Sequence, residues 1–187
     1  MSPSSSKKTS ILSRKKRQFY KIVVARQDIK AALDACKLFL AKVRSIGDDL
    51  YFPLLTAIIV CYSRPFSNNK PFGPLAKKWH AFDNAQLAET HKKILQLRDK
   101  TIAHSDLEIR KVFIFPKGTL IGNAGLRSGL GVTVRDIALP LKIFPVIKAT
   151  CLDLGSRLNL AVEKELQALF GSKELPPKEF ELTFDDE

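Results

Sequence analysis

Residues 50–63 read LYFPLLTAIIVCYS and form the most apolar segment of the chain. The longest apolar run, from Leu50 to Tyr62, holds thirteen residues when Pro53 and Thr56 are counted. A membrane-spanning helix needs about 20 such residues, so the run predicts a buried helix rather than a span. Pro53 suits the first turn of that helix, where a missing N–H costs no hydrogen bond. We therefore expect residues 50–63 to be the central helix of the fold.

Amphipathic segments lie on both sides of this helix. Residues 18–46 repeat apolar side chains at spacings of three, four and seven, as one face of a helix does. Residues 84–103 and 141–170 show the same periodicity, and Asp83 or Asn84 is suited to cap the first of them. Together these segments predict a mainly α fold, a bundle of four to five helices.

A different pattern interrupts the helices between residues 108 and 137. The segments KVFIFP (111–116) and VTVRDI (132–137) are rich in β-branched and aromatic residues, which favours strands. Five of the nine glycines stand between them, so we expect an inserted β-hairpin with a long tip. One hydrophobic face of the hairpin is expected to pack on the bundle. The alternative is that Phe113 and Phe115, with neighbouring basic residues, stack on RNA.

Charge divides the chain into three parts. The net charge is +12, and residues 1–17 contribute six basic residues and no acid. Residues 174–187, the acidic tail, contribute six acids and one lysine, which leaves +11 for residues 18–173. We expect a basic disordered tail at residues 1–17, a helical domain over residues 18–173, and then the acidic tail. A basic folded body is typical of proteins that bind nucleic acid, although ordinary solubility charge gives the same composition.

Several classes of protein are disfavoured. Cys36, Cys61 and Cys151 share no close spacing, which argues against a disulfide framework or a zinc ribbon and favours a reducing compartment, the cytoplasm. The first residues lack the apolar core of a signal peptide, and no membrane association is expected. The chain has no P-loop and no nucleophile elbow. Three histidines without paired spacing predict no metal site, and no cofactor is expected.

The polar groups with the clearest chemical potential stand in THKKILQLRDKTIAHSD, residues 90–106. On a helix, His91 and Arg98 fall within about 20° of the same azimuth, because seven residues make nearly two turns. His104 follows Arg98 by six positions and lies about 240° away in an ideal helix. It can meet Arg98 only if the helix ends or tightens near Ala103, or if a second copy of the chain completes the site.

The segment LRDKTIAHSD resembles the signature of the HEPN superfamily (higher-eukaryote and prokaryote nucleotide-binding domains). That signature is an arginine, usually followed by a polar residue, with a histidine four to six residues beyond. Arg98, Asp99 and His104 fill these places. His91 and the upstream YSRPF, residues 62–66, are similar to a subgroup associated with bacterial abortive-infection proteins.

The resemblance implies a helical bundle that forms a homodimer, with two such motifs facing one cleft. It also implies a metal-independent endoribonuclease of a toxin–antitoxin or antiviral system, held in check in some cases by an inhibitory partner protein. In this role His104 titrates near neutral pH and serves as base or acid. Arg98 presents a charged fork to the phosphate, and Asp99 orients either group. Lower-ranked contacts to the substrate are expected from His91, Arg64 and Lys100.

Each of these residues also has an interpretation without function. Arg98 and Asp99 can form a surface ion pair, and His104 can cap a helix end. His91 can be a hydrogen-bonded histidine at an interface, the interpretation that we favour for it, and Arg64 can be a cation at a helix end. Three functions therefore stay open: the endoribonuclease, a catalytically silent HEPN-like module that binds RNA, nucleotide or protein, and a helical scaffold whose basic surface is incidental.

Overall fold

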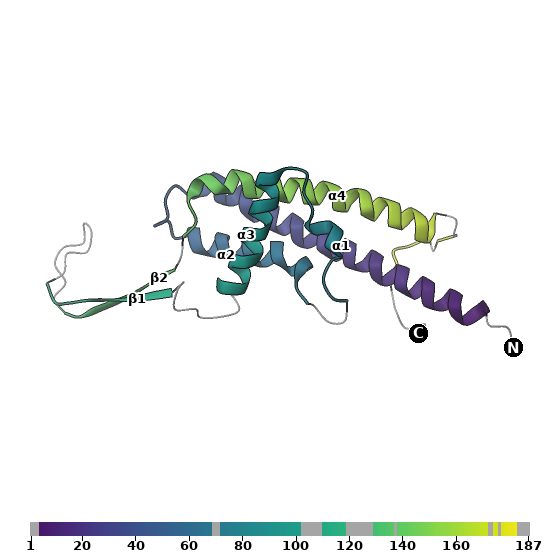
Figure 1. Ribbon diagram of the computed structural model, residues 1–187, viewed down its shortest axis with the longest axis horizontal. Helices are drawn as coiled ribbons and strands as arrows, with labels where there is room; N and C mark the ends of the chain where they lie inside the picture. The colour runs from purple at the N-terminus through teal and green to yellow at the C-terminus, as the bar shows by residue number, and fades with distance from the viewer. Residues whose placement is uncertain are drawn as a thin grey trace.

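The molecule is a helical bundle from which a β-hairpin projects (Figure 1). The computed structural model describes residues 4–68, 72–101, 110–118, 129–136, 138–171, 174–175 and 177–182. The α-helices of this part are α1 (Ser4–Lys42), α2 (Tyr51–Ser63), α3 (Ala85–Thr101) and α4 (Phe144–Phe170). The strands are β1 (Arg110–Phe115) and β2 (Gly131–Asp136), and the 3-10 turns are η1 (Arg64–Phe66), η2 (Lys77–His80) and η4 (Leu141–Ile143). The predicted mainly α fold is confirmed.

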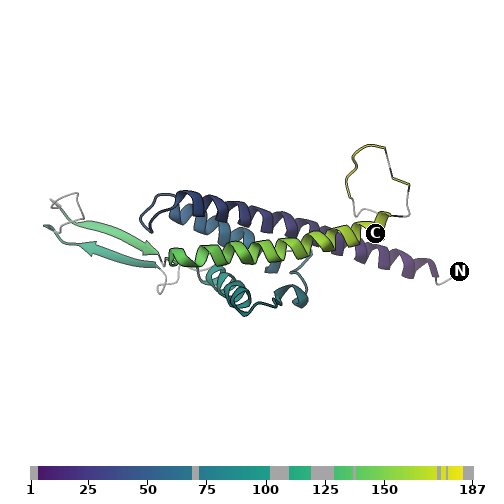
Figure 2. The same cartoon turned by 90° about the horizontal axis from the view of Figure 1, so that it is seen from above.

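Helices α1 and α4 run antiparallel along the length of the molecule, with α2 and α3 packed beside them (Figures 1 and 2). The buried residues of α1 recur at spacings of three and four: Ile22, Ala25, Ile29, Ala32, Cys36 and Phe39. The same spacing governs α4, at Phe144, Ile147, Cys151, Leu154, Leu158 and Val162. Such spacing lines one face of each helix. The two faces meet in the core, where the rings of Phe39 and Phe144 stack with their centroids 3.6 Å apart.

Helix α2 packs against α1 and α3, and its apolar residues supply part of the core. It buries Tyr51, Leu55, Ile58, Ile59, Tyr62 and Ser63. The Tyr51 hydroxyl donates a hydrogen bond to the carbonyl oxygen of Leu139 and accepts one from its N–H, each at 2.7 Å. These two bonds fasten the segment that follows β2 to the start of α2, and so fix the base of the hairpin on the bundle.

The amino-terminal segment differs from the expectation of a disordered tail. Helix α1 begins at Ser4 instead of near residue 18 and ends at Lys42 instead of residue 46. Nothing between Pro3 and Gly47 breaks a helix, because the intervening sequence holds neither glycine nor proline. Lysine and arginine are good helix formers, and the carboxyl half of α1 is anchored in the core. The helix therefore continues backward through a segment whose composition suggested disorder.

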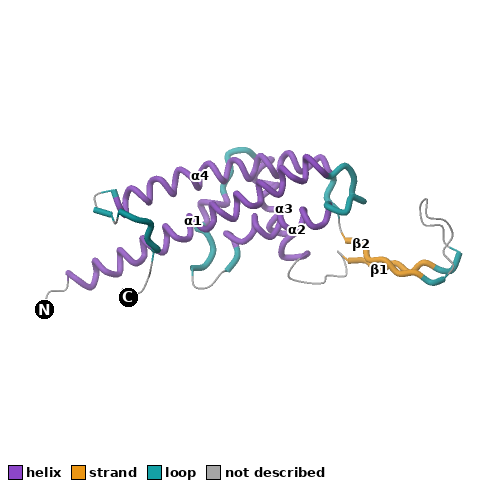
Figure 3. Tube along the Cα trace, turned by 180° about the vertical axis from the view of Figure 1, so that it is seen from behind, coloured by secondary structure: helices purple, strands orange, loops and turns teal. Residues whose placement is uncertain are grey.

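Strands β1 and β2 pair antiparallel, with Ile114 opposite Val132 in the register. The two strands extend away from the helices in every view (Figures 1, 2 and 3). The side chains of Ile114 and Val132 are 72% and 67% exposed, so the expectation that a hydrophobic face packs on the bundle is wrong for this pair. The fastening at Leu139 holds only the base of the hairpin, and six extended residues carry the strands about 20 Å beyond it. No helix in the described part is long and apolar enough to span a lipid bilayer.

Candidate functional site

Helix α3 carries the arginine of the predicted motif. The Asn84 side-chain oxygen accepts hydrogen bonds from the N–H groups of Gln86 and Leu87, at 2.9 and 3.2 Å. Asn84, rather than Asp83, therefore caps the helix, because it satisfies two of the first unpaired N–H groups. The helix packs against α2 and α4 and buries His91 and Ile94 on that side.

His91 lies at the centre of a compact group that we call the His91 cluster: Tyr62, Phe66, His80, Phe82 and His91. The Tyr62 hydroxyl is 2.9 Å from His91 Nδ1, and His80 Nδ1 is 3.0 Å from His91 Nε2. One tautomer satisfies both contacts. The Tyr62 O–H donates to Nδ1, and the His91 Nε2–H donates to His80. Burial raises the pKa of Tyr62 well above its usual value, which keeps its proton in place for this bond.

Aromatic rings and a cation close the cluster. The ring centroids of Phe66 and Phe82 lie 4.7 and 5.2 Å from that of His91. The Arg157 guanidinium of α4 stands 4.6 Å above the Phe82 ring and donates a hydrogen bond to the carbonyl oxygen of Ala81 at 2.8 Å. The segment before α3 is thereby held between α3 and α4.

His91 is neutral at pH 7. Its side chain is buried, and this burial, together with smaller effects of His80 and Arg157, lowers its pKa to about 4. Both ring nitrogens already have protein partners. This placement matches the hydrogen-bonded histidine between helices more closely than a contact to substrate. It also means that His91 holds α3 in place.

Arg98 stands two turns beyond His91, about 10 Å farther along the helix axis. Its Nη1 lies 3.0 Å from the Asp99 carboxylate, and the two side chains are 39% and 71% exposed. An exposed pair of this kind contributes at most about 1 kcal/mol to stability. Asp99 therefore restrains the guanidinium without burying it. Since a guanidinium has five N–H donors, one contact to Asp99 leaves it able to bind phosphate oxygens.

The remaining predicted residues are not gathered around Arg98 in the described part of the chain. His104 lies outside the described residues, as does the side chain of Lys100. Arg64, on η1, has its Nη1 3.5 Å from the Asp28 carboxylate of α1. Burial raises the pKa of Asp28, and Arg64 opposes that shift. The structure thus brings His91 into contact with Tyr62 and Phe66 of the YSRPF segment, whereas Arg64 of the same segment contacts Asp28.

Sequence reasoning missed two members of this arrangement. His80, which follows the buried Trp79, is exposed and hydrogen-bonds to His91. The sequence does not indicate a role for Arg157, because this residue lies between two core leucines of α4 and belongs to no recognisable motif. The YSRPF segment could have indicated such a partner. Its tyrosine lies at the end of a buried helix, and a buried tyrosine hydroxyl needs a hydrogen-bond partner.

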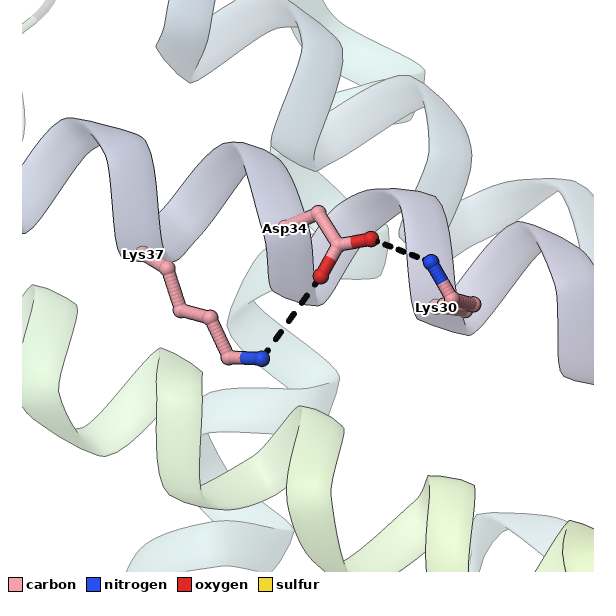
Figure 4. A network of polar contacts seen from close by, with 3 residues as sticks. All are labelled: Lys30, Asp34 and Lys37. Atoms are coloured by element: carbon pink, nitrogen blue, oxygen red, sulfur yellow. Dashed lines mark hydrogen bonds and ion pairs between the residues drawn. The ribbon is translucent and has the colours of Figure 1, made fainter.

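Several exposed side chains of α1 are cations, and the acid Asp34 lies among them. Asp34 lies between Lys30 and Lys37, with N–O distances of 2.6 and 3.6 Å (Figure 4). Its hydrogen bond to Lys30 lowers the pKa of Asp34. The middle of α1 therefore has part of its positive charge neutralised. Within the described residues, no group of three or more His, Cys, Asp or Glu side chains is arranged to hold a metal ion.

The Tyr62→Phe substitution tests the His91 cluster. It removes the hydrogen bond to Nδ1 and leaves that buried nitrogen without its partner, so the free energy of unfolding should fall by about 1–3 kcal/mol. Urea denaturation measures the loss. In a His91→Ala background the same substitution should cost much less, because the partner is already gone. Equal losses in the two backgrounds would show that the pair does not interact.

Comparison of the chain with protein-family models, with curated proteins and with solved structures finds no match. The interpretation of the site therefore depends on its own residues and geometry.

Proposed function

We propose that this protein is a metal-independent endoribonuclease of a bacterial defence or toxin–antitoxin system, acting in the cytoplasm. Its reacting groups in this proposal are Arg98, Asp99 and His104. The observation that carries it is the Arg98 guanidinium, which is restrained by Asp99 yet 39% exposed near the carboxyl end of α3. The net charge of +11 on residues 18–173 supports a polyanionic substrate.

The chemistry follows from the residue types. His104 removes the proton of a ribose 2′-hydroxyl, whose oxygen attacks the adjacent phosphorus. The bond from phosphorus to the 5′-oxygen breaks, and that oxygen takes up a proton. The products are a 2′,3′-cyclic phosphate and a free 5′-hydroxyl. Arg98 stabilises the added negative charge on the phosphorane, where a planar fork matches two oxygens.

The His91 cluster contributes rigidity to this mechanism. The two hydrogen bonds of His91 fix α3 two turns before Arg98. A phosphate-binding group on a helix that is locked by packing loses little freedom when it binds its substrate. Tyr62 and His91 are thus positioning residues in this account.

Incubation of the purified protein with labelled RNA in excess chelator tests the proposal. Cleavage in chelator is the expected result. RNA that is bound but left intact would replace the proposal with the catalytically silent binding module. If the RNA is neither bound nor cut, the remaining interpretation is a helical scaffold whose basic surface is incidental.

The proposal also predicts a homodimer. A single Arg–His motif needs a second proton-transfer group for the leaving oxygen, and a two-fold axis beside α3 would supply it from a second copy. Sedimentation at micromolar concentration should give twice the chain mass. A monomer that retains full cleavage activity would rule out the composite site.

A further inference from the structure

A basic surface separate from Arg98 lies at the end of the bundle opposite the hairpin. A cavity of about 480 Å³ opens there, lined by four cations, an aromatic ring and one acid, and we call it the basic cavity: Arg14, Lys15, Arg17, Lys21, Phe72 and Glu165. Arg14, Arg17 and Lys21 stand three and four residues apart, so α1 presents them along one face. The cavity thus places a row of cations beside an aromatic ring.

The wall of the basic cavity is held in place by the fold. Lys21 Nζ donates a hydrogen bond to the carbonyl oxygen of Pro74 at 3.1 Å. The ring of Tyr20 lies 4.6 Å from that of Phe72. These contacts keep the segment that carries Phe72 against α1. Single-stranded nucleic acids are bound by this combination, in which cations contact phosphates and an aromatic face stacks on a base.

Residues 177–182 are a described part of the acidic tail, and Phe180 among them lies near α4 and α1. The Phe180 ring is 6.2 Å from that of Phe170, and the Phe170 ring is 6.2 Å from that of Phe19 in α1. Glu179 and Glu181 flank Phe180 in sequence. The aromatic contacts therefore bring tail carboxylates to the part of α1 that carries the cations.

We propose that the basic cavity binds the phosphodiester backbone of single-stranded RNA, and that the acidic tail competes with RNA for it. This inference rests on the proposed function only because it takes RNA as the ligand. The cavity itself lies on α1 and not at Arg98. The tail carboxylates offer the cations the same negative charge that phosphates offer. Phe180 is 46% exposed, so the tail is held by a partial contact that a longer polyanion can displace.

Binding of a 2′-O-methyl RNA strand, followed by fluorescence anisotropy, tests the cavity, because that strand lacks the attacking hydroxyl and cannot be cleaved. One variant carries Arg14→Gln, Lys15→Gln and Arg17→Gln. The matched control removes the same charge at exposed lysines elsewhere, with Lys42→Gln, Lys77→Gln and Lys92→Gln. The cavity variant should bind about tenfold more weakly than the control, and the slope of log affinity against log salt should shrink by about 2, for three lost phosphate contacts. Equal losses in both variants would overturn the cavity as the binding site.

Neutralising the tail tests the competition. The tail variant carries Glu174→Gln, Glu179→Gln and Glu181→Gln, and its control carries Asp49→Asn, Asp83→Asn and Glu89→Gln, which changes the net charge equally. The tail variant should bind the strand several-fold more tightly than its control, and an equal gain in both would overturn the competition. Cleavage of unmodified RNA by the wild-type protein in excess chelator is measured separately. Binding that depends on the cavity, together with unmodified RNA left intact, would refute only the endoribonuclease and not the basic cavity.

Discussion

His104→Ala is expected to abolish RNA cleavage while the protein stays folded. Removal of an acid–base group typically slows a reaction by about 10² to 10⁴, so product should be undetectable in a gel assay with protein and RNA at micromolar concentration. Far-ultraviolet circular dichroism checks that the helical content is unchanged. Cleavage that survives the substitution at near the original rate would remove His104 from the reaction.

Arg98→Ala is expected to be as damaging as the histidine substitution. Arg98→Lys should restore little activity, because lysine keeps the charge but lacks the planar fork that binds two phosphate oxygens. Arg26→Ala is the matched control, since it removes one exposed arginine from α1. Full activity in Arg98→Lys would mean that a positive charge at this position is sufficient. An equal loss of cleavage in Arg26→Ala would mean that any lost positive charge lowers the activity.

The second large effect is a loss of stability in mild acid that originates at His91. The unfolded chain binds a proton at this histidine near pH 6.5, whereas burial keeps the folded form neutral until a pKa of about 4. The free energy of unfolding falls wherever the unfolded state binds more protons than the folded state. The contribution of His91 is thus fully present above pH 6.5 and is lost as the pH falls toward 4. The total loss is about 3 kcal/mol.

Urea denaturation at several pH values between 7 and 4 measures this loss. The His91→Gln variant is the control, because glutamine does not titrate. Other groups also change protonation over this range, so the difference between the two proteins isolates His91. The wild-type protein should lose about 3 kcal/mol more than the variant. Parallel curves for the two proteins would contradict the neutral, buried state of His91.

The helices could be predicted because their periodicity and their end signals agree. The segment of residues 50–63 became α2, and the cap of α3 was one of the two residues that the sequence offered. The start of α1 could not be predicted, because a serine-rich basic composition indicates disorder while the absence of glycine and proline allows a helix. The packing of the carboxyl half of α1 in the core favours the helix over disorder. The placement of the hairpin depends on the Tyr51 contact with Leu139, a pairing 88 residues apart that no local pattern encodes.

The candidate site was predictable only in part. The spacing of His91 and Arg98 on one side of α3 follows from helix geometry, and the sequence alone indicated it. The neutral state of His91 depends on Tyr62, His80 and Arg157, which three other elements deliver. Burial and its effect on pKa arise from this packing, so they became visible only in the folded chain.

We propose that this protein cleaves RNA by attack of the neighbouring 2′-hydroxyl, without a metal ion. The most direct measurement compares one oligonucleotide as RNA and as its 2′-deoxy counterpart, incubated with the protein in excess chelator and analysed by mass spectrometry. We expect that only the RNA is cut and that its fragments end in a 2′,3′-cyclic phosphate and a 5′-hydroxyl. Cleavage of both strands, or cleavage that appears only after magnesium is added, would contradict it.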